Sequence, residues 1–409
     1  MTVSRLLGAL LATCAGALTA PAAALAVDPV GRIGITTSGP VPDKEKVTAR
    51  TTVRDDGRTH YRGRIGIEVR GQSSQLFPKK AYSVELRDRD ASLLGLPAND
   101  DWVLYAAYND KTLMRNVLAY ETARGLGRYA SRTRWVELTL DGRYHGVYVL
   151  MEKLELGGER IDLPKPAQLL EWTFRFQADR KGGRAFKLPR SGYSILFEYP
   201  EKGDLEARRR TQVRRSVVRA EQALYARRFR DPAAGWRRHI DEPAAIDYLL
   251  LNELFKNQDA FHASTYLTQA AGGRWALGPI WDFDIAMGNS TYGPSARLKG
   301  SMLARRAWAR RFYRDPALVA GMAARWQALR AGGLRERLLD DVERHAQRLA
   351  STGSAGRNFH RWPVLGVQVW PNRPAAMTRN TYGSEVRALR GWLVRRVAWM
   401  DANVGRLGR

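Results

Sequence analysis

The stretch from 242 to 289 most constrains what this chain can fold into. A helix is predicted at its start, capped by Asp241 or Glu242, because apolar residues then recur at helical spacing, at Ile246, Leu249, Leu250 and Leu254. This pattern stops just before Asp259. Asp259 is therefore expected on a loop directly after a buried helix.

Two short strands, 265–267 and 275–277, are predicted next, with Gly272-Gly273 between them. The second strand leads to Asp282 and Asp284, which stand close together in an Asp-Phe-Asp triplet. Carboxylates this close repel each other unless a proton or a cation lies between them. The pattern therefore predicts a divalent metal held by these two side chains.

The order of helix, aspartate loop, hairpin and Asp-Phe-Asp matches that of a protein kinase's catalytic centre. There, a loop aspartate faces the substrate hydroxyl and a later aspartate holds magnesium. Neither His-Arg-Asp nor Asp-Phe-Gly, the usual kinase triplets, occurs in the chain. For one such motif alone, a helix end and a solvated acidic turn are the commoner explanation. Three acidic positions in kinase order after a buried helix favour the catalytic interpretation.

Several separate motifs then extend the similarity along the chain. They are Arg70-Gly71-Gln72-Ser73-Ser74 with Pro78-Lys79-Lys80, Asp101-Trp102 with Leu113-Met114-Arg115-Asn116, Gly146-Val147-Tyr148 with Met151-Glu152-Lys153, and Trp392…Arg396…Trp399-Met400-Asp401. With these motifs the chain resembles the CotH family, atypical kinase-like proteins named after a spore coat protein. The resemblance covers most of the chain from about Arg64 onward.

The resemblance implies an α+β, two-lobed atypical protein-kinase-like fold. After a signal peptide at 1–26, it implies a β-rich N-lobe at 27–156 and a mainly helical C-lobe at 157–409, with a nucleotide cleft between them. It also implies ATP and Mg²⁺ or Mn²⁺ as cofactors, and phosphate transfer to Ser or Thr of an exported protein. Asp259 would deprotonate the acceptor hydroxyl and Asp282 would hold the metal.

The N-terminal motifs predict a phosphate-binding region. The small residues after Arg70, with Ser73 and Ser74 among them, form a turn able to offer backbone N–H groups to phosphate. In the next strand Lys80 shares a face with Tyr82, Val84 and Leu86, so it is the preferred phosphate lysine; Lys79 is the fallback. Lys80 and Arg70 would neutralise charge developing in the reaction. The alternative is an edge-strand lysine pair that discourages aggregation.

Two further cofactor-binding predictions concern the segment 110–152. A helix at 110–125 stands where a kinase places the glutamate that steadies the phosphate lysine, so Glu121 is the candidate; an ordinary helix-surface residue is the alternative. A hairpin is predicted around Asp141-Gly142. It ends at Met151 and Glu152, which by resemblance form the hinge that lines the adenine pocket.

One position departs from the family pattern. The residue five after the catalytic aspartate is usually an asparagine that helps to hold a metal in CotH relatives, and here it is Ser264. Because a serine hydroxyl is a shorter, neutral ligand, Ser264 is expected to bind the metal through water or not at all. A drift toward an inactive kinase is the alternative.

The charge of the chain indicates attraction to polyanions. Lys and Arg number 67 against 41 Asp and Glu, a formal charge of +26. A generally basic, solvated surface explains this equally well. The competing function is an inactive kinase-like envelope protein that binds an acidic partner or an anionic envelope polymer. Nucleic-acid binding through the arginine-rich segment 201–240 is a third class and is not favoured.

The first residues indicate export. Residues 1–26 combine Arg5, an apolar run of small residues and Ala24-Leu25-Ala26, the pattern of a cleaved signal peptide. The only cysteine, Cys14, lies within this segment, so the mature chain would contain no disulfide. No other run reaches membrane-spanning length. A periplasmic or extracellular protein without stable membrane insertion is therefore expected.

Other enzyme classes lack their motifs. The six histidines are scattered, and His-Glu-x-x-His, Gly-x-Ser-x-Gly and the Gly-x-x-x-x-Gly-Lys-Ser/Thr loop do not occur. The sequence therefore argues against a zinc enzyme, an α/β-hydrolase and a P-loop nucleotidase.

Overall fold

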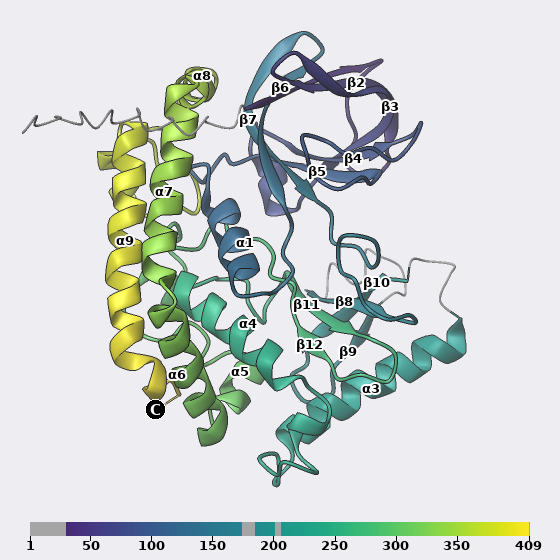
Figure 1. The fold of residues 1–409 in the computed structure, drawn as a ribbon, viewed down its shortest axis with the longest axis vertical. Helices are drawn as coiled ribbons and strands as arrows, with labels where there is room; N and C mark the ends of the chain where they lie inside the picture. Colours follow the sequence, from purple (N-terminus) through teal and green to yellow (C-terminus); the bar gives the residue numbers. More distant parts are fainter. Residues whose placement is uncertain (1–29, 174–184, 201–205, 409) are drawn as a thin grey trace, which may run out of the picture.

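The computed structural model describes residues 30–173, 185–200 and 206–408. The predicted signal peptide, 1–26, lies outside these residues. A β-barrel stands at one end of the molecule, and helices with a smaller sheet fill the other end (Figure 1). None of the helices in the described ranges has the length and apolar character needed to cross a bilayer.

Seven strands close into the barrel, in the order β1-β2-β3-β4-β5-β7-β6. Neighbouring strands are antiparallel except β1 and β6, whose parallel pairing closes the ring. Ile65 and Ile67 alternate into its core and are fully buried. The predicted hairpin at Asp141-Gly142 joins β6 to β7. The strands are β1 Gly31–Thr37, β2 Val47–Asp55, β3 Arg58–Arg70, β4 Ala81–Leu86, β5 Asp101–Tyr105, β6 Thr133–Leu140 and β7 Arg143–Glu152.

The rest of the described chain combines helices with a five-stranded sheet of order β12-β11-β8-β10-β9. Helix α1 packs against α4 and α7, and α7 and α9 run side by side along one edge of the molecule (Figure 1). The strands are β8 Gln168–Thr173, β9 Ala185–Lys187, β10 Ser194–Tyr199, β11 Thr265–Gln269 and β12 Ala276–Leu277. The helices are α1 Arg115–Gly125, α3 Ala207–Tyr225, α4 Glu242–Phe255, α5 Ala307–Phe312, α6 Pro316–Ala331, α7 Leu334–Ser351, α8 Ser354–Arg361 and α9 Tyr382–Asn403.

This architecture corrects the expected fold. The α+β class is right, but the two-lobed kinase-like fold is wrong, because the N-terminal part is a closed seven-stranded barrel. Pairing of β1 with β6 leaves this sheet without a free edge. The C-terminal part is mainly helical and also contains the five-stranded sheet, to which the predicted strands near 265 and 276 belong as β11 and β12.

Helix α4 is the predicted buried helix, and its ends explain its length. The Asp241 carboxylate accepts a hydrogen bond of 2.7 Å from the Ala244 N–H, so Asp241 is the N-cap rather than Glu242. Lys256 ends the helix with φ of +50°, in the left-handed region. The chain therefore turns sharply three residues before Asp259.

A buried ion pair fixes the C-terminal end of α4. Glu253 and Arg396, from α9, are completely buried, and Arg396 Nη2 lies 3.2 Å from Glu253 Oε2. Glu253 also accepts hydrogen bonds from the Tyr313 hydroxyl and from the backbone N–H groups of Met302 and Leu303. A buried charge pair is tolerated when its remaining hydrogen bonds are satisfied in this way. The network therefore holds the helix that leads to Asp259.

Candidate active site

The loop after α4 presents Asp259 in a fixed turn. The Asp259 N–H donates to Asn257 Oδ1 at 3.1 Å, and the Asp259 carbonyl accepts from the N–H groups of His262 and Ala263, both at 2.8 Å. The side chain is partly buried. The backbone of the loop at Asp259 is thus held by hydrogen bonds that do not involve the Asp259 carboxylate.

The Asp-Phe-Asp segment lies after β12, and α1 positions it. The Asp282 N–H donates to the Tyr120 hydroxyl at 3.3 Å, and the Phe283 N–H donates to Asn116 Oδ1 at 2.6 Å. Asp282 itself has φ of +62°, a left-handed conformation that costs energy outside glycine. The contacts from α1 hold Asp282 in this conformation.

The three aspartates lie near enough for their charges to interact. Burial, with the neighbouring Asp284 charge, raises the pKa of Asp259 to about 7. Burial, with the charge of Asp259, raises the pKa of Asp282 to about 6. Burial and the charge of Asp282 raise the pKa of Asp284 well above its usual value. Each carboxylate is thus harder to ionise because the others are near.

The pair formed by Asp282 and Asp284 suits a divalent cation. Their side chains lie within hydrogen-bonding reach of each other, and burial together with the charge of Asp282 disfavours ionising Asp284 as well, an obstacle that a bound cation would remove. Mg²⁺ is commonly held by one or two carboxylates, with waters and phosphates completing its shell. Within the described ranges, no group of three or more His, Cys, Asp and Glu is arranged to hold a metal by itself. A metal held by these two carboxylates would take its other ligands from water or phosphate oxygens.

Three buried asparagines that the sequence analysis did not single out support this pair. The Asn109 side chain is hydrogen-bonded to Asp284. Asn289 Nδ2 donates to the Asp284 carbonyl at 2.7 Å, and Asn372 Nδ2 donates to Asn289 Oδ1 at 3.0 Å. They come from three segments far apart in sequence. Of the three, only Asn289, close behind the triplet, could have been suspected from the sequence.

Arg70 brings positive charge to the carboxylates. Its guanidinium carbon lies 5.1 Å from the centre of the Trp281 ring, and its charge acts to lower the pKa of Asp282. The turn that follows is tight: Gly71 has φ of +106°, and a Cβ there would lie 2.0 Å from the Ser74 Oγ. The turn with Ser73 and Ser74 therefore begins beside the candidate site.

The structure separates the two candidate lysines. The Lys80 ammonium donates to the backbone carbonyl of Gln75, in the turn that carries the two serines. The Lys79 side chain points away from this turn and is completely buried. It donates to the Val147 carbonyl at 2.6 Å and to Asn358 Oδ1 at 2.9 Å. The structure therefore does not bring Lys79 to the carboxylates.

Lys79 should make stability depend on pH. Burial lowers the pKa of Lys79 from 10.5 to about 7. Between these values the unfolded chain binds a proton that the folded chain does not, so we expect stability to rise with pH in this window, by about 1 kcal/mol per pH unit. In the Lys79→Met variant, the free energy of unfolding should no longer show this increase with pH. Urea unfolding at several pH values between 7 and 10 measures it, and an unchanged slope would contradict the assignment.

Glu121 has partners other than a phosphate lysine. Arg344 Nη2 and His345 Nε2 lie 3.0 and 2.8 Å from Glu121 Oε2. Burial acts to raise the pKa of Glu121, but the bonds to His345 and Arg344 outweigh it and lower the pKa to about 2. The structure therefore uses Glu121 to join α1 to α7 and does not pair it with Lys79 or Lys80.

Met151 and Glu152 lie inside the barrel wall. Met151 pairs with Val103 on one side and Thr133 on the other, and is buried. Glu152 is also buried, and its carboxylate accepts a hydrogen bond of 2.9 Å from Arg132 Nε. The backbone of β7 is thus paired on both sides here. Both residues therefore lie in paired strand backbone, and their part in an adenine pocket stays a prediction.

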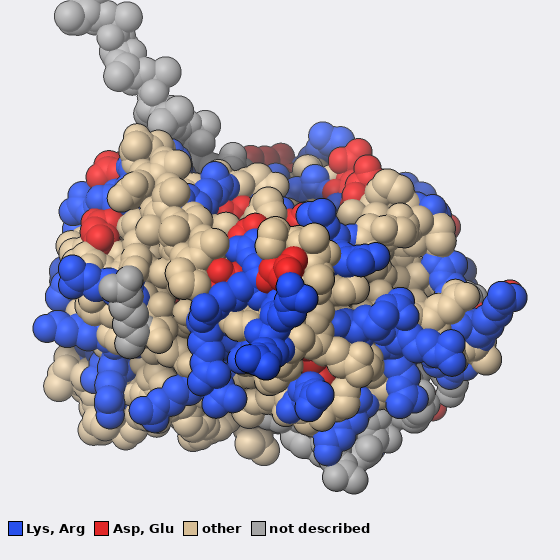
Figure 2. Space-filling view, turned by 90° about the horizontal axis from the view of Figure 1, so that it is seen from below, with Lys and Arg blue, Asp and Glu red and all other residues tan. Residues whose placement is uncertain are grey.

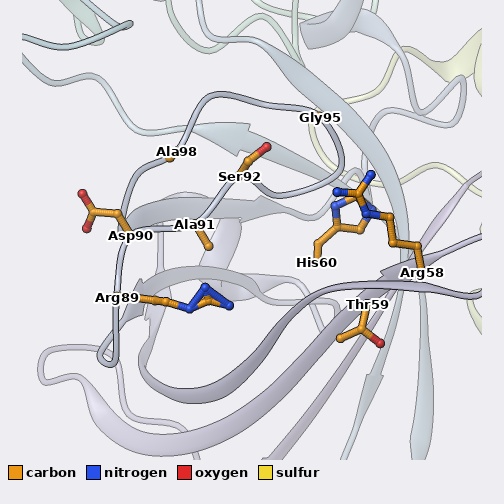
Figure 3. A pocket seen from close by; sticks show the side chains of 9 residues that line it. All are labelled: Arg58, Thr59, His60, Arg89, Asp90, Ala91, Ser92, Gly95 and Ala98. Carbon is orange, nitrogen blue, oxygen red and sulfur yellow. The ribbon is translucent and has the colours of Figure 1, made fainter.

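A separate cavity of about 340 Å³ lies on the barrel and shares no residue with the carboxylate site. Figure 3 shows that Arg58, His60, Arg89 and Asp90 surround it. The His60 ring is already bonded to Asp55 at 2.7 Å. The cavity therefore adds no group to the candidate active site.

The fold and the site together define an α+β protein with a paired-carboxylate centre. A model of the CotH kinase protein family matches residues 67–400. The chain therefore belongs to the CotH kinase family, and a kinase-like function follows from this membership. No curated protein sequence matches the chain.

Proposed function

We propose that this protein transfers phosphate from ATP to Ser or Thr hydroxyls of an exported protein. The observation that carries the proposal is the grouping of Asp259 with the hydrogen-bonded pair Asp282 and Asp284. A base with a pKa near 7 can both exist ionised and accept a proton at neutral pH, and burial gives Asp259 such a pKa. Family membership supports the same reaction class.

Each residue has a definite part in the proposed reaction. Asp259 orients the acceptor hydroxyl and accepts its proton as the oxygen bonds to the terminal phosphorus. The bond from that phosphorus to the bridging oxygen breaks, and ADP leaves. Asp282 and Asp284 would hold Mg²⁺ or Mn²⁺, which when bound would neutralise charge on the phosphates. Arg70 adds positive charge from the side of Trp281, where its guanidinium lies. Phosphoryl transfer needs mainly such positioning and charge stabilisation.

The proposal is tested with radiolabelled ATP and the purified mature chain. Incubation with Mg²⁺ or Mn²⁺ and a mixture of exported proteins should label a protein acceptor, and the label should remain on Ser or Thr after hydrolysis. The competing function is an inactive kinase-like protein that binds an acidic partner, which the charge of +26 favours. Such a binder would give no more label than its Asp259→Asn variant.

Ser264 should set the metal requirement of the proposed enzyme. Ser264 has φ of +47°. Asparagine tolerates this left-handed region better than most residues, so Ser264→Asn should fold normally and add an amide ligand. We expect the variant to need several-fold less free Mg²⁺ for half-maximal activity. A metal titration measures this, and an unchanged midpoint in an active enzyme would remove Ser264 from the metal site.

A further inference from the structure

One face of the molecule, opposite the barrel, is rich in arginine. Figure 2 views the molecule from this end and shows Lys and Arg side chains spread across it, with few Asp and Glu. The exposed arginines around α5 and around the segment that follows α3 form a surface that we call the arginine face. They are Arg305, Arg310 and Arg314, with Arg227, Arg228 and Arg230.

The positive charge of the arginine face is largely unneutralised. Of its six members, only Arg228 has a carboxylate partner among the described residues, Asp231, at 3.9 Å. Arginines elsewhere in the chain are commonly paired, as Arg237 is with Asp315 at 2.6 Å. A cluster of unpaired, exposed guanidinium groups produces a strong local positive potential. Such a surface suits a partner that supplies several negative charges.

The arginine face is continuous with the acceptor side of the candidate active site. Arg306 Nη2 donates to the Gln258 carbonyl at 3.1 Å, and the charge of Arg306 acts to lower the pKa of Asp259. Arg306 is followed directly by α5, a helix of six residues and so about 9 Å long. Arg311, within α5, donates to the carbonyl of Ala226 at 3.2 Å. Arginines therefore lead from Asp259 to residues 226–230.

The aromatic residues at this face are covered. Phe229 and Trp236 are buried, and the Arg311 guanidinium carbon lies 4.2 Å from the centre of the Phe229 ring. Proteins that bind single-stranded nucleic acid stack bases on exposed aromatic rings. The described part of the arginine face offers no exposed ring of this kind. Its chemistry therefore favours a chain of carboxylates over a nucleic acid.

We infer that the arginine face binds an acidic segment of the phosphate acceptor. This inference rests on the proposed kinase function and specifies its substrate: a Ser or Thr placed at Asp259, followed or preceded by a run of Asp and Glu along α5. The guanidinium groups bind these carboxylates as charged, forked hydrogen-bond donors. The interaction raises the local concentration of acceptors beside the site.

Binding of two peptides to two variants tests the inference. The peptides share a Ser acceptor and differ only in a flanking Asp/Glu run, replaced by Asn/Gln in the second. One variant carries Arg305→Gln, Arg310→Gln and Arg314→Gln. The control carries the same number of changes on the barrel, at the exposed residues Arg32, Arg50 and Arg54. Both variants thus have the same net charge.

Fluorescence anisotropy is measured without ATP. The acidic peptide should bind about tenfold more weakly to the variant changed at Arg305, Arg310 and Arg314 than to the wild type, because three partly screened charge pairs are lost. The barrel variant should bind it like the wild type, and the neutral peptide should bind all three proteins weakly. Equal losses in both variants, or equal binding of both peptides, would overturn the inference.

Competition with an oligonucleotide separates the partner classes. Failure of the acidic peptide to displace a bound single strand would overturn the inference in favour of nucleic acid. Because binding is measured without turnover, the expected binding pattern without any phosphate transfer would support the docking surface while counting against the proposed kinase activity.

Discussion

Replacing Asp259 by Asn should lower the rate of phosphate transfer at least about a hundredfold, the lower end for loss of a general base. The amide has the shape of the carboxylate but cannot accept the proton of the acceptor hydroxyl. The backbone of the loop should persist, because its hydrogen bonds are made by the Asp259 N–H and carbonyl rather than by the side chain. The change should therefore reduce turnover and leave ATP binding intact.

Initial rates with labelled ATP measure this effect, with Asp340→Asn as the matched control. Asp340 is an exposed residue of α7, so its variant has the same charge change at a distance from the site. The melting temperature of the Asp259→Asn protein should be at least as high as that of the wild type, because one of three mutually repelling carboxylates is removed. Unchanged transfer in a folded variant would strike Asp259 from the mechanism.

Local patterns predicted the elements around the site well. The apolar period and an acidic cap are properties of consecutive residues, and they placed α4 and the loop with Asp259. The Asp-Gly hairpin was equally local, because its turn type is decided by two residues. In each case no distant contact was needed.

Barrel closure could not be predicted in this way. Apolar alternation in β3 is the same whether a sheet is open or closed. Closure depends on β1 meeting β6, and their pairing of Gly31 with Val136 joins residues about a hundred positions apart. No local pattern encodes such a contact. The kinase analogy implied a β-rich N-lobe of a two-lobed fold, and the closed barrel is why that predicted fold was wrong.

Lys79 and Lys80 show that the alternation of side chains predicts their directions only within a strand. Extending the strand pattern back from Tyr82 made Lys80 the preferred lysine and Lys79 the fallback, and Lys80 does lie at the turn with the two serines. The pattern did not predict that Lys79 is buried, because β4 begins only at Ala81. Before it, the turn sets the side-chain directions, and Lys79 becomes the buried residue. The asparagines that support Asp284 were missed for a related reason. Asn109 and Asn372 come together only through the tertiary fold.

Replacing Asp282 by Ala should abolish the stabilisation of the protein by ATP with Mg²⁺. A ligand at a hundred times its dissociation constant adds about 2.7 kcal/mol to the free energy of unfolding, and this increment should vanish without the cation's carboxylate. The unliganded variant should remain folded, because the contacts of α1 at this turn are made by the Asp282 and Phe283 N–H groups. Loss of the site and loss of the fold are thereby distinguishable.

The left-handed backbone of Asp282 calls for a second variant beside Ala. Asn tolerates this conformation, so Asp282→Asn removes the charge with the least backbone cost. Both variants should show no shift in melting temperature with ATP and Mg²⁺, whereas Asp340→Ala should show the full shift of the wild type. A full shift in both Asp282 variants would mean that the cation is held elsewhere, with Asp284 as the next candidate because its side chain is hydrogen-bonded to Asp282.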